Sequence, residues 1–184
     1  MIERLEDYRD RWAGQEVTLV GCGPTDADYN NLPDQPTICV NESVYQVTRP
    51  DRYFFTLHPA KFEPAWEIAT WLKWVSVQNP AEPSRYIGIN FSWEKGQRLH
   101  WQLDKEYCAR HNRLAIRYGS LSAAIHFAWF AGAKSVLGVG INPQTAELGY
   151  DPRIGDVPPN PHMRFLVARM VEDFTFFNLL VRYL

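Results

Sequence analysis

Glu16-Val17-Thr18-Leu19-Val20-Gly21-Cys22-Gly23-Pro24-Thr25 is the stretch that decides the fold class. Its first five residues are mostly apolar and β-branched and are followed directly by glycine, which predicts a buried strand of a parallel sheet. Residues 21–25 then predict a tight loop at the carboxyl end of that strand. Two glycines there allow close approach of the backbone to a ligand, and exposed N–H groups can hold a phosphate. The alternative is a tight turn without a ligand, because the third glycine of the dinucleotide fingerprint is absent.

Segments of the same kind follow along the chain. Buried strands are predicted at residues 37–41, 52–57 and 135–140, and short strands at 74–77 and 86–89. Helices are predicted at 2–12, at 61–72, at 120–131 and from 162 onward, and residues 179–183 fit either a continued helix or an edge strand. Alternating strands and helices favour an α/β fold, in which a single Rossmann-like domain over residues 1–184 holds an open, mostly parallel sheet flanked by helices.

Composition narrows the functional classes. The chain has 184 residues, 46% hydrophobic and 22% charged, which is the balance of one folded domain. A net charge of −2 argues against a nucleic-acid partner, and no apolar run is long enough to span a membrane. The charged N-terminus lacks the apolar core of a signal peptide, and three cysteines without metal-binding spacing suggest reduced thiols. A cytoplasmic location is therefore expected.

The middle of the chain differs in composition from the rest. Residues 79–112 are polar and rich in proline, tryptophan and charge, which predicts an irregular insertion that could act as a lid. Five tryptophans lie in or just before this insertion: Trp66, Trp71, Trp74, Trp93 and Trp101. Packing beneath a long loop or an interface in a homo-oligomer is favoured over a stacking platform for a ligand.

Polar residues that end the predicted strands are the first candidates for function, because ligands bind such sheets beyond the carboxyl ends of the strands. Asn41 and Glu42 follow the second strand, His58 closes the third, and Asn142 follows the strand at 135–140. The Asn41 amide can pair with a nucleotide base through both a donor and an acceptor. The alternative for Asn41 is a helix N-cap.

Two further groups could carry chemistry. His162 follows a proline-rich loop at the start of the last helix, where it could act as a general base toward a hydroxyl, or be an ordinary surface residue. Asp26 and Asp28 have the spacing of the acidic pair that holds a metal in many glycosyltransferases, but capping of a helix start is the favoured interpretation. No metal site is therefore predicted.

The motifs together resemble a known family. The segment Val20-Gly21-Cys22-Gly23-Pro24-Thr25, the pair Asn41-Glu42 and the stretch from Ser120 to Asn142 resemble the bacterial sialyltransferases of glycosyltransferase family 42. They also resemble the related Rossmann-like group of archaeal hydroxymethyldihydropterin pyrophosphokinases and uncharacterised phage and bacterial proteins. The part that is most similar is Gly132-Ala133-Lys134-Ser135-Val136-Leu137-Gly138-Val139-Gly140-Ile141-Asn142, which matches a helix end, a strand and a Gly-Ile-Asp close in the sialyltransferases.

This resemblance implies a site for a cytidine nucleotide donor. Their place at the predicted strand ends makes Cys22, Glu42, His58 and Asn142 candidates for nucleotide binding. The resemblance itself implies nucleotide contacts at Gly21, Gly23, Pro24, Thr25, Asn41 and Ser120. It implies that His162 is the general base, and Tyr150 is the nearby tyrosine that could replace a family tyrosine at the leaving phosphate. The sequence departs from the family pattern at four positions: His58, Leu121, Asn142 and Gln144.

Three functions follow as expectations. The first is a glycosyltransferase-like enzyme that uses a CMP-type nucleotide or nucleotide-sugar and an acceptor that the sequence does not identify, with no obligatory cofactor. The second is an ATP-dependent, pyrophosphokinase-like enzyme, which would require Mg²⁺ because phosphoryl transfer relies on metal charge. The third is a non-catalytic protein that keeps the fold as a binding or assembly module, which the four departures favour.

Overall fold

The computed structural model describes residues 4–48, 52–56, 61, 73–77, 86–93 and 97–184. The candidate residue His58 lies outside the described residues, and so does the predicted helix at 61–72 apart from Lys61, including Trp66 and Trp71.

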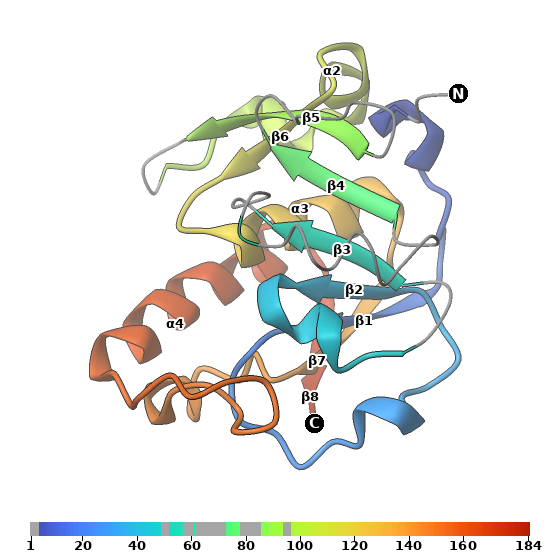
Figure 1. The fold of residues 1–184 in the computed structure, drawn as a ribbon. Helices are drawn as coiled ribbons and strands as arrows, with labels where there is room; N and C mark the ends of the chain where they lie inside the picture. Colours follow the sequence, from blue (N-terminus) through green and yellow to red (C-terminus); the bar gives the residue numbers. More distant parts are fainter. Residues whose placement is uncertain (1–3, 49–51, 57–60, 62–72, 78–85, 94–96) are drawn as a thin grey trace.

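Eight parallel strands form one sheet in the order β6-β5-β4-β3-β2-β1-β7-β8 (Figure 1). The strands are β1 (Glu16–Val20), β2 (Thr37–Val40), β3 (Arg52–Thr56), β4 (Lys73–Val77), β5 (Tyr86–Trp93), β6 (Arg113–Ile116), β7 (Ser135–Val139) and β8 (Leu180–Tyr183). The chain adds strands outward from β1 to β6 and then returns to place β7 on the other side of β1. This confirms the predicted single α/β fold, and it puts the reversal of strand order between β1 and β7.

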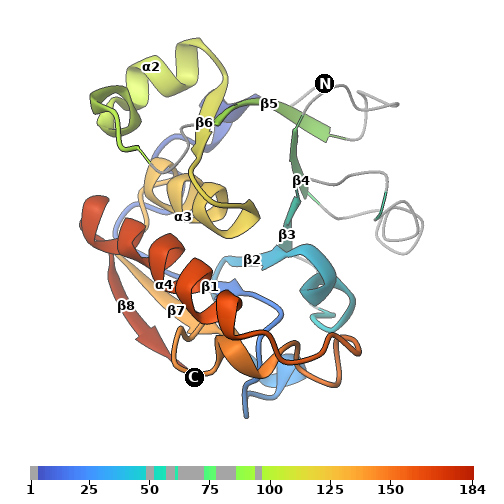
Figure 2. The ribbon, with the colours of Figure 1, turned by 90° about the vertical axis from the view of Figure 1, so that its left-hand side faces the viewer.

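The two faces of the sheet are covered differently. The α-helices α2 (Lys105–Arg110), α3 (Ser120–Phe130) and α4 (Pro161–Phe176) lie together on one face (Figure 2). On the opposite face the described elements are shorter, and they include the 3₁₀ helices η2 (Tyr29–Asn31) and η3 (Asn41–Tyr45). Further 3₁₀ helices among the described residues are η1 (Leu5–Tyr8), η6 (His100–Leu103) and η7 (Ala146–Leu148). Within the described chain, no helix is long and apolar enough to cross a lipid bilayer.

Alternation along the strands divides the core between these faces. In β2, Ile38 packs with the helices while Cys39 packs on the opposite face, and in β3 Phe55 and Phe54 divide in the same way. All four side chains are completely buried. A strand buried on both faces has no polar face, which is why these segments appear in the sequence as continuous apolar runs.

The N-terminal segment corrects the sequence prediction of a helix over residues 2–12. The described part forms only the short 3₁₀ helix η1 followed by turns. Asp10 adopts a left-handed backbone conformation with φ 55°, and its N–H donates to the carbonyl of Phe130 at 3.2 Å. The N–H of Trp12 donates to Ala131 at 2.6 Å. These peptide groups bond to the end of α3 instead of to their own preceding turn, which prevents a continuous helix.

The middle of the chain is more regular than its composition suggested. Within residues 79–112 the described parts form β5, η6 and α2, and β5 pairs with β6, a strand that the sequence did not predict. At the C-terminus, Asn178 adopts φ 54° after α4, and β8 then pairs with β7 as an edge strand. The open choice at residues 179–183 is therefore decided in favour of a strand.

Candidate functional site

The glycine loop after β1 is packed against the end of β7. The N–H of Gly21 donates to Val139 at 2.8 Å, and the N–H of Gly23 donates to Gly140 at 2.9 Å. A Cβ on Gly23 would lie 2.9 Å from the carbonyl oxygen of Gly140, and one on Gly21 would lie 2.5 Å from the Ile141 side chain. The contact between the two loops therefore explains both glycines, and these two N–H groups already have backbone acceptors.

Thr25 ties the same loop to the end of the chain. Its hydroxyl donates to the carbonyl of Leu184 at 3.0 Å and accepts from the N–H of Ala27 at 3.2 Å. Thr25 is thus held by neighbours on both sides, with Pro24 between it and the packed glycines. The structure places residues 21–25 at the carboxyl edge of the sheet, as the sequence predicted.

Cys22, Glu42 and Tyr150 come together at this edge from three separate segments. The Cys22 thiol lies 3.4 Å from the carbonyl of Val40 and 3.7 Å from Oε2 of Glu42. Burial, followed by the negative charge of Glu42, raises the pKa of Cys22 to about 12. Burial also raises the pKa of Tyr150, and Cys22 and Glu42 raise it further. At neutral pH the cluster therefore holds a neutral thiol and a neutral phenol beside one carboxylate.

Lys61 balances the charge of that carboxylate. Its ammonium group forms an ion pair with Oε1 of Glu42. The Glu42 side chain is only 17% exposed, whereas that of Lys61 is 64% exposed. Glu42 thus presents one oxygen to a solvent-exposed cation and the other to Cys22.

Asn41 has a backbone conformation that is unusual for a residue with a side chain. Its φ is 55°, which asparagine tolerates better than most residues, and it begins η3 directly after β2. Its side-chain oxygen accepts a hydrogen bond from the hydroxyl of Thr56 at 3.0 Å, at the end of β3. Val40 occupies the N-cap position of η3, so the capping alternative for Asn41 is wrong.

Ser120 and Asn142 also lie at this edge, each at the start of a new segment. Ser120 is the buried first residue of α3. The side-chain oxygen of Asn142 accepts from the N–H of Gln144 at 3.0 Å, and its carbonyl accepts from Ala146 at 3.1 Å. Asn142 therefore closes a turn at the beginning of the loop that carries Tyr150.

His162 lies on the exposed first turn of α4. Asn160 caps this helix by accepting from the His162 N–H at 3.0 Å, and the imidazole stacks on Phe165 with a centroid distance of 6.0 Å. The start of α4 is on the same side of the sheet as the arrowheads of the strands (Figure 1). In the described structure, no hydrogen bond or ion pair joins the His162 ring to Cys22, Glu42 or Tyr150.

A second cluster, which the sequence did not predict, holds the loop after β7 against the glycine loop. Arg153 binds Asp151 through two contacts of 2.9 and 2.6 Å and donates to the carbonyls of Thr25 and Ala27 at 2.5 and 2.9 Å. Its guanidinium also lies 4.5 Å from the ring centre of Tyr29. Arg153 thereby lowers the pKa of Asp151. The proline-rich sequence around these residues carries no pattern that predicts such long-range contacts.

The acidic pair Asp26 and Asp28 has a structural explanation at its second member. The Asp28 carboxylate accepts from the N–H of Asn30 at 3.0 Å and caps η2, which confirms the capping interpretation. Among the residues that the structure describes, no group of three or more histidine, cysteine, aspartate or glutamate side chains is arranged to hold a metal ion.

Comparisons of this chain with protein-family models, with curated proteins and with solved structures found no match.

Proposed function

We propose that this chain binds a nucleotide or nucleotide-sugar at the carboxyl edge of its sheet and acts as a glycosyltransferase-like enzyme. The observation that carries the proposal is the convergence of Cys22, Glu42 and Tyr150 beside β1, next to the reversal of strand order. In open parallel sheets this is where ligands bind, because the loops on either side diverge there. A carboxylate and two neutral donors can together read the hydroxyl and carbonyl groups of a nucleoside.

Each residue has a role in this proposal. Asn41 and Glu42 orient the base and the ribose, and the neutral phenol of Tyr150 donates a hydrogen bond to the phosphate as the sugar leaves it. Gly21 and Gly23 already donate their N–H groups to the end of β7 and the residue after it. In this proposal the phosphate is therefore contacted by Tyr150 and Ser120. His162 accepts the proton of the acceptor hydroxyl, whose oxygen forms the new bond to the sugar carbon.

A thermal-shift experiment with CMP, CDP, ATP and GTP, each with and without Mg²⁺, tests this function. A ligand at about 100 times its dissociation constant stabilises a protein by ~2.7 kcal/mol, or roughly 5–10 °C for a chain of this size. We expect a metal-independent shift with the cytidine nucleotides. The isosteric variants Glu42→Gln and Tyr150→Phe should reduce it, whereas Glu172→Gln, a carboxylate on the far half of α4, should not.

The other outcomes each point to a different function. A shift that requires both ATP and Mg²⁺ would contradict the glycosyltransferase proposal and favour phosphoryl transfer. No shift with any nucleotide, in a well-folded sample, would favour a non-catalytic binding or assembly module. The N–H groups of Gly21 and Gly23 already bond within the fold, and this observation supports the non-catalytic module as the second candidate.

A further inference from the structure

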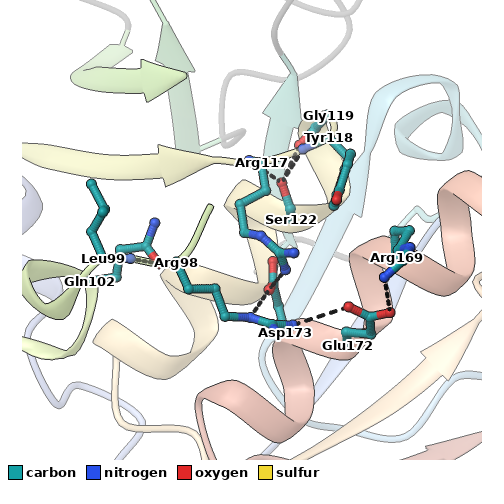
Figure 3. A network of polar contacts seen from close by, with 10 residues as sticks. All are labelled: Arg98, Leu99, Gln102, Arg117, Tyr118, Gly119, Ser122, Arg169, Glu172 and Asp173. Atoms are coloured by element: carbon teal, nitrogen blue, oxygen red, sulfur yellow. Dashed lines mark hydrogen bonds and ion pairs between the residues drawn. The ribbon is translucent and has the colours of Figure 1, made fainter. Parts of the chain in front are cut away.

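A buried ionic network joins the loop after β6 to α4 (Figure 3). Arg117 is the first residue after β6, and its Nη1 forms an ion pair with Oδ1 of Asp173 in α4. The two side chains are only 5% and 3% exposed. Arg98 lies 3.4 Å from the same carboxylate and 3.4 Å from Glu172. The contact between Arg117 and Asp173 thus lies inside the protein, whereas the outer members of the network reach solvent.

The same loop is also held from the side of α3. The hydroxyl of Ser122 accepts from the N–H of Arg117 at 3.0 Å and from that of Tyr118 at 3.4 Å. It donates to the carbonyl of Gly119 at 2.9 Å. Residues 117–119 are therefore fixed between α3 and α4, and Ser120 follows them directly.

Stability alone does not explain a buried ion pair at this position. Removing two charges from water is costly, and well-packed apolar side chains of similar volume often stabilise a protein as much or more. Burial raises the pKa of Asp173 although two arginines lie beside it, so desolvation outweighs their attraction. What apolar side chains cannot supply is the direction of the contact, because an ion pair with hydrogen-bond geometry accepts one orientation.

We propose that Arg117 and Asp173 are positioning residues, which set the loop after β6 and the first turn of α3 in register with α4. Ser120 lies at one end of this arrangement, and α4 carries His162 at its far end. The functional consequence of the register rests on the function proposed above. The positional consequence does not, because it concerns only how the loop and the two helices are held together.

Three variants separate a role of the Arg117–Asp173 pair in positioning the loop from a role in the stability of the fold. Asp173→Asn leaves Arg117 buried without its anionic partner and should lower the midpoint of thermal unfolding by many degrees. The double variant R117M/D173L replaces the pair with apolar side chains and should return the midpoint to within a few degrees of the original chain. Glu172→Gln removes an exposed carboxylate of the same network and should leave the midpoint unchanged.

Amide hydrogen exchange in R117M/D173L then measures how firmly the loop is held in place. We expect the amides of residues 117–123 to exchange at least tenfold faster than in the original chain, while those of β1 and β7 keep their protection. Unchanged exchange at 117–123 in the stable double variant would show that the pair is structural only and would overturn the proposal. If the double variant does not fold, Arg117→Lys, which keeps the charge but loses the planar fork, should show the same local effect.

Nucleotide binding adds a second readout. If the original chain binds a nucleotide, R117M/D173L should bind it at least tenfold more weakly at unchanged thermal stability. Full affinity in that stable variant would contradict a role of the pair in the site. If the original chain binds none, the proposed function fails, and the exchange measurement still decides whether Arg117 and Asp173 position the loop.

Discussion

The loop after β1 and the loop after β6 lie at the same edge of the parallel sheet, yet different contacts hold them in place. Backbone contacts with the end of β7 hold the glycines of the first loop, through the N–H groups of Gly21 and Gly23, while Arg153 binds the carbonyls of Thr25 and Ala27 further along. Side chains hold the second, through the hydroxyl of Ser122 and the buried pair of Arg117 and Asp173. The glycine loop resembles a phosphate-binding loop in sequence because both kinds of loop need glycine where another group packs closely against the backbone. That group can be a phosphate or, as here, a neighbouring loop.

This difference sets what each loop responds to. A backbone contact between glycines carries no titratable group, so it is sensitive to added side-chain atoms and insensitive to pH. A contact made by serine, arginine and aspartate side chains responds to protonation and to substitutions that keep the backbone intact.

The largest effect is expected from Gly140→Ala, which adds one methyl group to the backbone contact. Gly140 has φ +62°, and a Cβ there would lie 2.6 Å from the carbonyl oxygen of Gly23. Backbone strain and overpacking should together lower the free energy of unfolding by about 3 kcal/mol, measured by urea denaturation. Gly155, where a Cβ would meet no atom within 4 Å, is the matched control, and its alanine variant should stay within about 0.5 kcal/mol. Equal stability of the two variants would show that the two loops do not need their close contact.

The next effect tests the β6 side through pH. His126 in α3 accepts from the N–H of Ala115 at 2.9 Å and contacts the carbonyl of Gln102 at 3.0 Å, so its neutral form fits both neighbours when Nε2 carries the proton. Burial lowers the pKa of His126 to about 3, from an ordinary value of 6.5. As the pH falls, His126 therefore binds a proton near pH 6.5 in the unfolded chain but only near pH 3 in the folded chain. The stability is complete above pH 6.5 and declines as the pH falls through this window.

The decline should approach ~1.4 kcal/mol per pH unit from this one residue. Urea denaturation at pH 7, 6 and 5 measures it, and His126→Gln should remove this part of the slope while leaving the contribution of the carboxylates. Parallel pH profiles for the variant and the original chain would show that His126 is not buried as a neutral group.

A smaller effect is expected from Ser122→Ala, which removes the hydroxyl that bonds to three backbone groups of the loop. The buried N–H of Arg117 then lacks this acceptor, and the free energy of unfolding should fall by about 1–2 kcal/mol in the same denaturation assay. Thr48→Ala is the control, because the Thr48 hydroxyl makes an exposed contact with Asn30 that should contribute little. A loss no larger than in the control would mean that the ion pair alone fixes this loop.

Much of the sheet could be predicted from the sequence because β1, β2, β3 and β7 are buried almost throughout. The apolar runs that contain β1, β2, β3 and β7 stand out for that reason. β6 was missed because it begins with Arg113 and directly follows a polar segment. The N-terminal helix was wrong although Leu5, Tyr8 and Trp12 are buried as their spacing predicted, because the peptide groups of Asp10 and Trp12 bond to the end of α3.

The candidate site divides in the same way. Strand ends gave Cys22, Asn41 and Glu42 as candidates, since adjacent parallel strands bring their carboxyl ends together. Tyr150 followed only from the family resemblance, and nothing in the sequence pointed to Arg153 or Asp173. Their partners lie far away along the chain, and a single charged residue in a loop or helix carries no periodic signal.

By itself the sequence determined the α/β class, most of the strands and the edge of the sheet where polar groups gather, because local hydrophobic patterning records which segments are buried. Only the tertiary structure decided that the glycine N–H groups bond to the loop after β7, that Glu42 meets both Cys22 and Lys61, and that Asp173 holds Arg117. These contacts depend on residues brought together by strand order. No local pattern along the chain specifies that order, because it results from how the whole sheet and its helices pack.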